Sequence, residues 1–336
     1  MLAPGRDQPP GSGENEVEFF RGVNIDWLKL KWYFLGFSLI FSVLGLIAMG
    51  VNLGRIGSPV PLGVDFKGGT QVQVQFQQTP DLNQIRSATS AAGIKDASVV
   101  TYDVASNNEV LIGLPEQHNE AALDQGQKQI VDALHDHYGN PFTVRNVSVV
   151  GPTVGKQLEK QALLATLWSM AGMLVYLWFR FQLIYGVAAV VACFHDTLIT
   201  VGAFALLNKE ISLTVIAAIL TLVGYSMNDT IVVFDRIREN LRLSRRESLP
   251  DVVNRSINQT LSRTVLTSGL TFLTVLSLYI FGGPVLGGFS FALVVGILIG
   301  TYSSIAVAAP MLVAWQQWRA SRGAVAVLPA AKRARA

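Results

Sequence analysis

Residues 223–240 read Val-Gly-Tyr-Ser-Met-Asn-Asp-Thr-Ile-Val-Val-Phe-Asp-Arg-Ile-Arg-Glu-Asn, and this segment sets the architecture expected for the chain. It continues an apolar run, and an aspartate, Asp229, lies inside that run before basic residues begin at Arg236. A charged side chain at the centre of a bilayer costs about 2.5–3.5 kcal/mol on insertion scales. The segment is therefore typical of a membrane-spanning helix that ends near a basic surface and contains an acid needed for function.

The composition of the whole chain supports a membrane protein. Of 336 residues, 50% are hydrophobic and 15% charged, and the mean hydropathy is +0.39. A soluble domain contains about 25% charged residues. Long apolar runs alternate with polar stretches, which indicates a soluble insert in a membrane protein. One cysteine, Cys193, excludes a disulfide framework, and no Cys/His cluster has the spacing of metal ligands. We therefore expect no metal or other cofactor, and no enzyme, since a nucleophile–base set is also missing.

Six segments are long enough to cross about 30 Å of hydrocarbon, which takes roughly 20 helical residues. They are Trp32–Leu53, Gln161–Phe181, Gln182–Leu206, Ile211–Phe234, Thr264–Phe281 and Val285–Trp315. The last is longer than one span, so we expect it to tilt or to continue past the interface. The predicted divisions are an N-terminal segment at 1–31 (disordered over 1–18), a span at 32–53, an inserted domain at 54–160, a bundle at 161–315 with a basic loop at 235–263, and a tail at 316–336.

Lysine and arginine in short loops predict the orientation. The N-terminal segment has four, the loop 235–263 seven and the tail five, whereas the opposite side offers only Lys209 between spans three and four. Both termini should therefore be cytoplasmic and the 54–160 domain external. The pI near 9.0 then reflects membrane topology, so no nucleic-acid partner is expected. Two interpretations of the loop 235–263 remain open, a topology signal with a helix at the lipid headgroups or a docking surface.

The inserted domain shows alternating and helical patterns in a definite order. Strands are expected at 71–76, 97–102, 109–114 and 142–150, with a turn at 106–108, and helices at 81–92 and 116–138. The order strand, helix, strand, strand, helix, strand is the split βαβ or ferredoxin-like plan. The predicted fold class is a membrane all-α six-helix bundle with an inserted α+β ferredoxin-like extracytoplasmic domain. We interpret His118, His135 and His137 as solvated, and the domain as a binding or mechanical module.

Residues 63–70, Gly-Val-Asp-Phe-Lys-Gly-Gly-Thr, precede the first strand. Consecutive glycines permit backbone conformations and close approaches that a side chain prevents. The segment is either a simple turn into the strand or a structural motif made by Asp65, Phe66, Gly68 and Gly69.

Two charged residues lie near the inner ends of spans four and five. At 1.5 Å per residue, Asp229 lies roughly 8 Å outward from Phe234, and Arg263 begins the antiparallel span five. A small shift of either boundary brings the two side chains within reach. Pairing would hold Asp229 ionised, whereas separation in a dry site would favour its protonated form. Alternatively, Arg263 extends to the headgroups and Asp229 is a hydrogen-bond partner between helices.

His195 and Asp196 lie in span three, outward of its middle. Neighbouring residues are about 100° apart on a helix, so the two side chains cannot both face one partner. Helix packing and a second station on a proton path are the two interpretations. We expect Asp196 and Asp229 to be offset by something like 10 Å, which argues against an intramembrane protease dyad.

From about residue 19 to 318 the chain resembles the SecF family, the membrane-embedded auxiliary subunit of bacterial preprotein export in the resistance-nodulation-division superfamily. The resemblance is carried by residues 223–240, by Asn258-Gln259-Thr260-Leu261-Ser262-Arg263-Thr264, by His195-Asp196 and by Asp65-Phe66-Lys67-Gly68-Gly69. Lys67 stands where a threonine is usual, so a role for that hydroxyl does not transfer to this chain.

The resemblance implies proton-driven work at Asp229 and Arg263, and we expect Asn228, His195 and Asp196 to contribute. It also implies a SecD partner in trans, association with the SecYEG channel and a translocating preprotein, and a multi-pass location in the bacterial cytoplasmic membrane. Half of a proton-driven small-molecule or lipid exporter of the same superfamily is the main alternative. A passive scaffold is the other.

Overall fold

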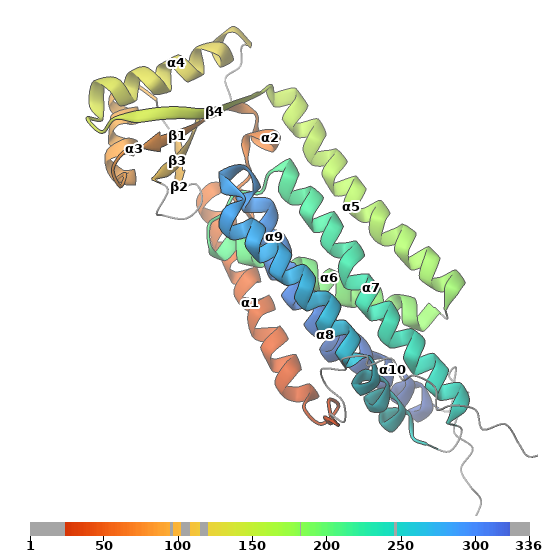
Figure 1. The fold of residues 1–336 in the computed structure, drawn as a ribbon. Coiled ribbons are helices and arrows are strands. Elements are labelled where there is room, and N and C mark those ends of the chain that lie inside the picture. Colours follow the sequence, from red (N-terminus) through yellow and green to blue (C-terminus); the bar gives the residue numbers. More distant parts are fainter. Residues whose placement is uncertain are drawn as a thin grey trace, which may run out of the picture.

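The computed structural model of the chain describes residues 24–94, 97–101, 108–114, 120–181, 183–244 and 247–322. A bundle of long helices carries a small α/β domain at one end (Figure 1). Six helices in these residues are long and apolar enough to cross a membrane, as the sequence predicts. They are α1 (Lys31–Ile56), α5 (Pro152–Arg180), α6 (Leu183–Leu206), α7 (Leu213–Leu243), α8 (Leu249–Phe281) and a last span made of α9 (Gly283–Ser303), the π-helical turn η2 (Ser304–Ala308) and α10 (Ala309–Ser321).

Helices α6, α7 and the last span form the centre of the bundle. About half of the residues in their most apolar windows are buried, against 17% or less in α1, α5 and α8. Helix α5 runs along the edge of the bundle (Figure 1). The outer helices expose many large apolar side chains, which is the surface a lipid-facing helix presents.

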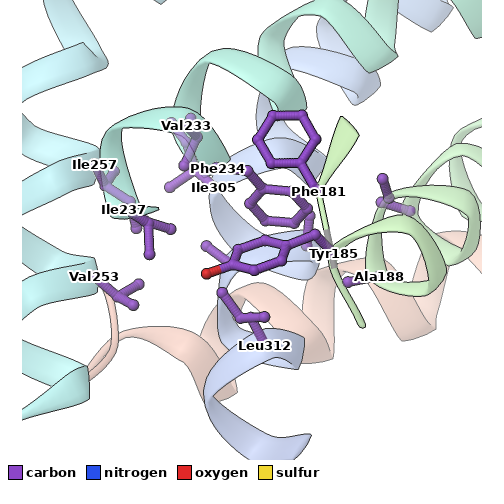
Figure 2. Packing of buried hydrophobic residues seen from close by; sticks show 14 of the residues in the cluster. Phe181, Tyr185, Ala188, Val233, Phe234, Ile237, Val253, Ile257, Ile305 and Leu312 are labelled. Atoms are coloured by element: carbon purple, nitrogen blue, oxygen red, sulfur yellow. The ribbon is translucent and has the colours of Figure 1, made fainter. Parts of the chain in front are cut away.

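A cluster of buried apolar side chains packs the central helices against one another at the end of the bundle away from the α/β domain. Figure 2 shows Tyr185 of α6 and Phe234 of α7 at its middle, and their ring centroids are 5.2 Å apart in an edge-to-face arrangement. Ile257 of α8 and Leu312 of α10 are fully buried in the same cluster. Four helices are therefore fixed against one another at this end.

The segment predicted as a basic loop, 235–263, is helical for most of its length. Helix α7 continues to Leu243 and α8 already begins at Leu249. The charged ends of these helices bond to each other, because Arg236 donates to Gln259 at 2.7 Å and Asn240 donates to Ser256 at 2.9 Å. Basic residues end an apolar span without ending the helix, and this is why the prediction placed both helix boundaries too close to the membrane.

The strands and the two longer helices of the α/β domain follow the predicted order, and a short helix that was not predicted precedes them. The helices are α2 (Val64–Lys67), α3 (Leu82–Ala91) and α4 (Glu120–His137), and the strands are β1 (Gly69–Phe76), β2 (Ser98–Thr101), β3 (Glu109–Leu114) and β4 (Phe142–Val150). The strands form one sheet in the order β2-β3-β1-β4, and all neighbours are antiparallel. Asp81 caps α3 by accepting hydrogen bonds from the amides of Asn83 and Gln84.

One face of the sheet carries the core of the domain. Val72, Val74 and Phe76 of β1 are buried against Ile85 of α3 and Leu134 of α4. The alternation that predicted the first strand is thus the alternation of this core face.

Some predictions lie outside the described residues. In this domain they are His118, and Ser106 and Asn107 of the predicted turn; in the N-terminal segment it is the disorder over 1–18. His135 and His137 are exposed near the end of α4, in keeping with solvated side chains.

Candidate functional site

Asp229 is buried between α7 and α8. The residue is 3% exposed, and its Oδ2 accepts a 2.7 Å hydrogen bond from the hydroxyl of Ser268. This donor was not singled out from the sequence, where Ser268 is one of several serines and threonines along α8. A carboxylate buried with a single neutral donor has little compensation for the water it has lost. Asp229 is therefore better suited to changing its protonation state or its partner than to remaining a permanent buried charge.

Arg263 is near Asp229 but makes no ion pair within the described residues. The guanidinium is close enough for Coulombic attraction to the carboxylate. Ser268 lies five residues further along α8, about 7.5 Å along the axis, and takes the position expected for the arginine. The predicted direct pairing is therefore absent in this arrangement, because a shorter hydroxyl donor lies at the level of Asp229.

Arg263 lines a polar groove of about 460 Å³ at the end of the bundle opposite the α/β domain. Arg180 of α5, and Asp235 and Arg236 of α7, also line this groove. Arg236 is paired with Glu239 at 2.7 Å. These charged groups make the groove polar enough to hold water, and Arg263 both lines the groove and lies near the buried Asp229.

Asn228 faces outward, unlike its neighbour Asp229. It lies on an exposed stripe of α7 that also contains Thr221, Gly224 and Asp235, at helical spacing. The Asn228 side chain makes no hydrogen bond within the described residues. A primary amide that faces hydrocarbon without a partner is costly, so this stripe is the natural surface for another polar or small-residue helix.

Asp196 forms a second buried carboxylate site. Its Oδ2 accepts hydrogen bonds from Ser226 of α7 at 2.5 Å and Ser303 of α9 at 2.7 Å, and its Oδ1 lies 2.9 Å from Nδ1 of His195. The carboxylate is 1% exposed. His195 and Asp196, which are adjacent in sequence, thus interact with each other, and α6, α7 and α9 meet at the Asp196 carboxylate.

The predicted offset of about 10 Å between the two carboxylates is wrong. Asp196 bonds to Ser226, which precedes Asp229 by three residues, so the axial offset is about 4.5 Å. The prediction measured the depth of Asp229 from Phe234, whereas α7 continues to Leu243. Each carboxylate nevertheless has its own hydroxyl donors, and α7 supplies Ser226 to one site and Asp229 to the other.

Several polar atoms around these acids are buried without a hydrogen-bond partner among the described residues. Nε2 of His195 and the hydroxyls of Tyr225 and Thr264 belong to this group. Buried polar groups are normally paired with protein or water. The interior of the bundle is therefore more polar near Asp196 and Asp229 than a purely structural core requires.

The segment with the double glycine lies at the opposite end of α7. Oδ2 of Asp65 accepts a 2.8 Å hydrogen bond from the amide of Leu213, the first residue of α7. Gly68 and Gly69 have φ of 74° and 114°, which L-residues rarely adopt. Phe66 is buried with Ile211 in a common apolar cluster. The motif predicted from Asp65, Phe66, Gly68 and Gly69 is thus more than a turn, because it binds the start of another helix.

Sequence comparison places the chain among known families. The family described as protein export membrane protein SecD/SecF, C-terminal, matches residues 130–318, and the SecD/SecF GG motif matches residues 56–80. Protein translocase subunit SecF of Koribacter versatilis is 55% identical over 93% of this chain and 96% of its own length. The subunit of the same name from Desulfurispirillum indicum is 43% identical over 87% of this chain and 92% of its own length.

Solved structures show the same similarity. A crystal structure of SecDF from Thermus thermophilus, described as a translocon-associated membrane protein, matches with a TM-score of 0.77 and 36% identity over 88% of this chain. SecDF in a super-membrane-facing form matches with a TM-score of 0.62 and 36% identity over 90% of this chain. This chain spans 39% and 40% of those two solved chains.

Proposed function

Because the chain belongs to the SecF family of protein translocase subunits, we propose that it uses the proton motive force to promote protein export, with Asp229 as the group that gains and loses the proton. The single observation that carries this proposal is the burial of Asp229 beside one neutral donor, with the cation of Arg263 nearby but unpaired. One proton moving inward under 100 mV releases about 2.3 kcal/mol. That free energy is comparable to a change of partner at a buried carboxylate.

Protonation of Asp229, on α7, would change how strongly it interacts with Ser268 and Arg263 of α8. The neutral acid keeps its hydrogen bond to Ser268, whereas the ionised acid attracts Arg263 more strongly. In this proposal the groove that Arg263 lines admits water and protons from the cytoplasmic side. In this proposal Arg263 moves in response to the charge on Asp229, and α7 and α8 shift relative to each other.

We propose that His195 and Asp196 form a second proton-binding site, on the outer side of Asp229. Asp196 shares α7 with Asp229 through Ser226, and Nε2 of His195 is buried without a partner among the described residues. A proton transferred between the two levels would travel only about 4.5 Å along the helix axis. We assign Asn228 a different part, at the surface towards a partner.

We propose that the partner is a SecD chain. The relative from Brucella abortus named SecDF matches this chain over only 37% of its own length, so the rest of that protein is additional sequence. The exposed stripe of Thr221, Gly224 and Asn228 on α7 gives a partner helix a close approach and a hydrogen bond. Contacts with the SecYEG channel and with a translocating preprotein are proposed on the family resemblance.

The proposed orientation follows from the same assignment. In this proposal the termini, which are rich in basic residues, lie in the cytoplasm of a bacterial cell, and the α/β domain lies outside its cytoplasmic membrane. We assign this domain to the ferredoxin-like plan, because β3 lies between β1 and β2, and β1 lies between β3 and β4. Such a domain, outside the membrane, is positioned to hold an emerging polypeptide.

The test measures export into vesicles that contain the assembled translocase, with and without an imposed proton gradient. We expect Asp229→Asn to remove the gradient-dependent part of export and to leave assembly unchanged. Asp132→Asn, an exposed carboxylate of α4, is the matched control. Arg263→Lys should retain more activity than Arg263→Gln because it keeps the charge. Full gradient-dependent export by Asp229→Asn, or by Asp229→Asn combined with Arg263→Gln, would reject the proton role in favour of a passive scaffold.

A further inference from the structure

The base of the α/β domain is bonded to the start of the helix that carries Asp229. Residues 60–68 lead from α1 into the domain, and they lie against the connection between α6 and α7. The amide of Ile211 donates to the carbonyl of Pro61 at 2.8 Å, and the amide of Gly63 donates to the carbonyl of Ile211 at 2.9 Å. These two bonds form a short parallel bridge at Leu62 and Ile211.

Asp65 extends this bridge into the first turn of α7. The first amides of a helix have no partner within it. The hydroxyl of Ser212, the residue just before α7, accepts a hydrogen bond from the amide of Val215. The carboxylate of Asp65, in the segment 60–68, accepts one from the amide of Leu213. A negative charge at this end is also favoured by the helix dipole. The contact is therefore a cap supplied by a residue 148 positions away in sequence.

The same segment is held on its other side by β1 and α5. Gln71 of β1 donates to Glu210, next to the bridge, at 2.9 Å. A Cβ added to Gly155 of α5 would lie 2.6 Å from the carbonyl oxygen of Phe66, so α5 passes this segment at the closest possible distance. The segment consequently has little freedom to move independently of either neighbour.

Helix α7 connects this joint to the buried acid. It is continuous from Leu213 to Leu243, and Asp229 lies sixteen residues, or about 24 Å, from Leu213. A helix without a break transmits a displacement along its axis. Movement of α7 at Asp229 would therefore reach the Leu213 amide, the Asp65 carboxylate and then β1.

We propose that Asp65 is a positioning residue that couples α7 to the external domain, so that a change at Asp229 moves the domain. This inference rests on the proposed function, because it takes Asp229 to be the driving site. Asp65 acts as an acceptor for the Leu213 amide, and an uncharged acceptor of similar shape should preserve most of the coupling. The backbone bridge at Ile211 persists when the carboxylate is removed, so the joint loosens without coming apart.

The test measures the distance between two spin labels in the full chain, assembled with its SecD partner in lipid vesicles. Labels replace Lys128, exposed on α4, and Ser277, exposed on the outer part of α8, in a Cys193→Ala background, so that a domain carried by α7 changes its distance from α8. Asp229→Asn mimics the protonated acid. We expect it to shift the distance distribution when Asp65 is present, to give at most about one fifth of that shift with Asp65→Ala, and to keep most of it with Asp65→Asn, since Asn and Asp cap helices comparably.

The outcomes separate the coupling from the proton role. An equal shift with Asp65 and with Asp65→Ala overturns the inference, and so does the absence of any shift on Asp229→Asn. Gradient-dependent export is measured in the same vesicles. If Asp229→Asn abolishes it while the label shift survives Asp65→Ala, the proposed function stands and the coupling is rejected. If Asp229→Asn exports normally, the proposed function fails whatever the labels report.

Discussion

Ser268 of α8 donates a 2.7 Å hydrogen bond to Asp229 of α7, and this is the only direct polar contact of that carboxylate within the described residues. The bond joins the two helices in the middle of an apolar bundle. Arg263, the charged residue that was expected to pair with Asp229, lies about 7.5 Å from Ser268 along the axis of α8, towards the start of that helix, and it lines the polar groove. A hydroxyl serves both protonation states, because it donates to a carboxylate and also bonds to a neutral acid.

Ser268→Ala should therefore weaken the site without removing its charge. The carboxylate would lose its donor while buried, at a cost of about 1–3 kcal/mol, and we expect gradient-dependent export to fall at least about fivefold. Thr274→Ala on the same helix is the control, since that residue is exposed and its hydroxyl donates to the carbonyl of Leu270 in its own helix. Equal export by the two variants would show that Ser268 does not support Asp229.

The Asp196 site predicts a contrast between two adjacent serines. Ser303 donates to the Asp196 carboxylate, whereas Ser304 donates to the carbonyl of Thr301 in its own helix. Both are fully buried. We expect Ser303→Ala to lower the free energy of unfolding by about 1–3 kcal/mol, and Ser304→Ala to lower it by less than about 1 kcal/mol. Thermal unfolding in detergent measures the difference, and equal losses would contradict a special role for the carboxylate.

The sequence predicted the six spans and the order of elements in the α/β domain because both depend on local hydrophobic pattern. The partners of the buried acids were not predictable in this way. Ser226, Ser268 and Ser303 look like ordinary helix serines, and only the packing of α6, α7, α8 and α9 brings them to Asp196 and Asp229. The capping of α7 by Asp65 was equally hidden, because it joins segments 148 residues apart. A weak signal did exist, namely polar residues on the buried faces of apolar helices.

Close contact between α1 and α6 depends on two glycines. A Cβ on Gly202 would lie 2.8 Å from Cα of Gly45, and α1 is otherwise mostly exposed. Gly202→Ala must push the helices apart, and we expect a loss of about 1–3 kcal/mol in the free energy of unfolding. Gly50→Ala on α1 has open space around its Cβ and should be neutral or stabilising. An unchanged stability of Gly202→Ala would show that α1 is not held at this crossing.

Asn258 and Asn254 attach the segment before α1 to α8. The Asn258 side chain accepts from the amide of Ile25 at 3.2 Å, and the Asn254 side chain accepts from the amide of Trp27 at 2.8 Å. Each bond protects a different amide from exchange with solvent. We expect Asn258→Ala to speed hydrogen exchange at Ile25 more than at Trp27, and Asn254→Ala to do the reverse, each by about five- to tenfold for the loss of one hydrogen bond.

The two variants control each other, because both shorten an asparagine on the same face of the same helix. Asn258 also accepts from Nε1 of Trp27 at 3.0 Å and donates to the carbonyl of Ile25 at 2.9 Å, so its removal should loosen the segment more widely than removal of Asn254. Residue-resolved exchange measured in detergent distinguishes the patterns. If both variants accelerated exchange uniformly over 24–30, the segment would be held by packing of Trp27 and Phe34, whose rings stack at 6.0 Å, and not by the asparagines.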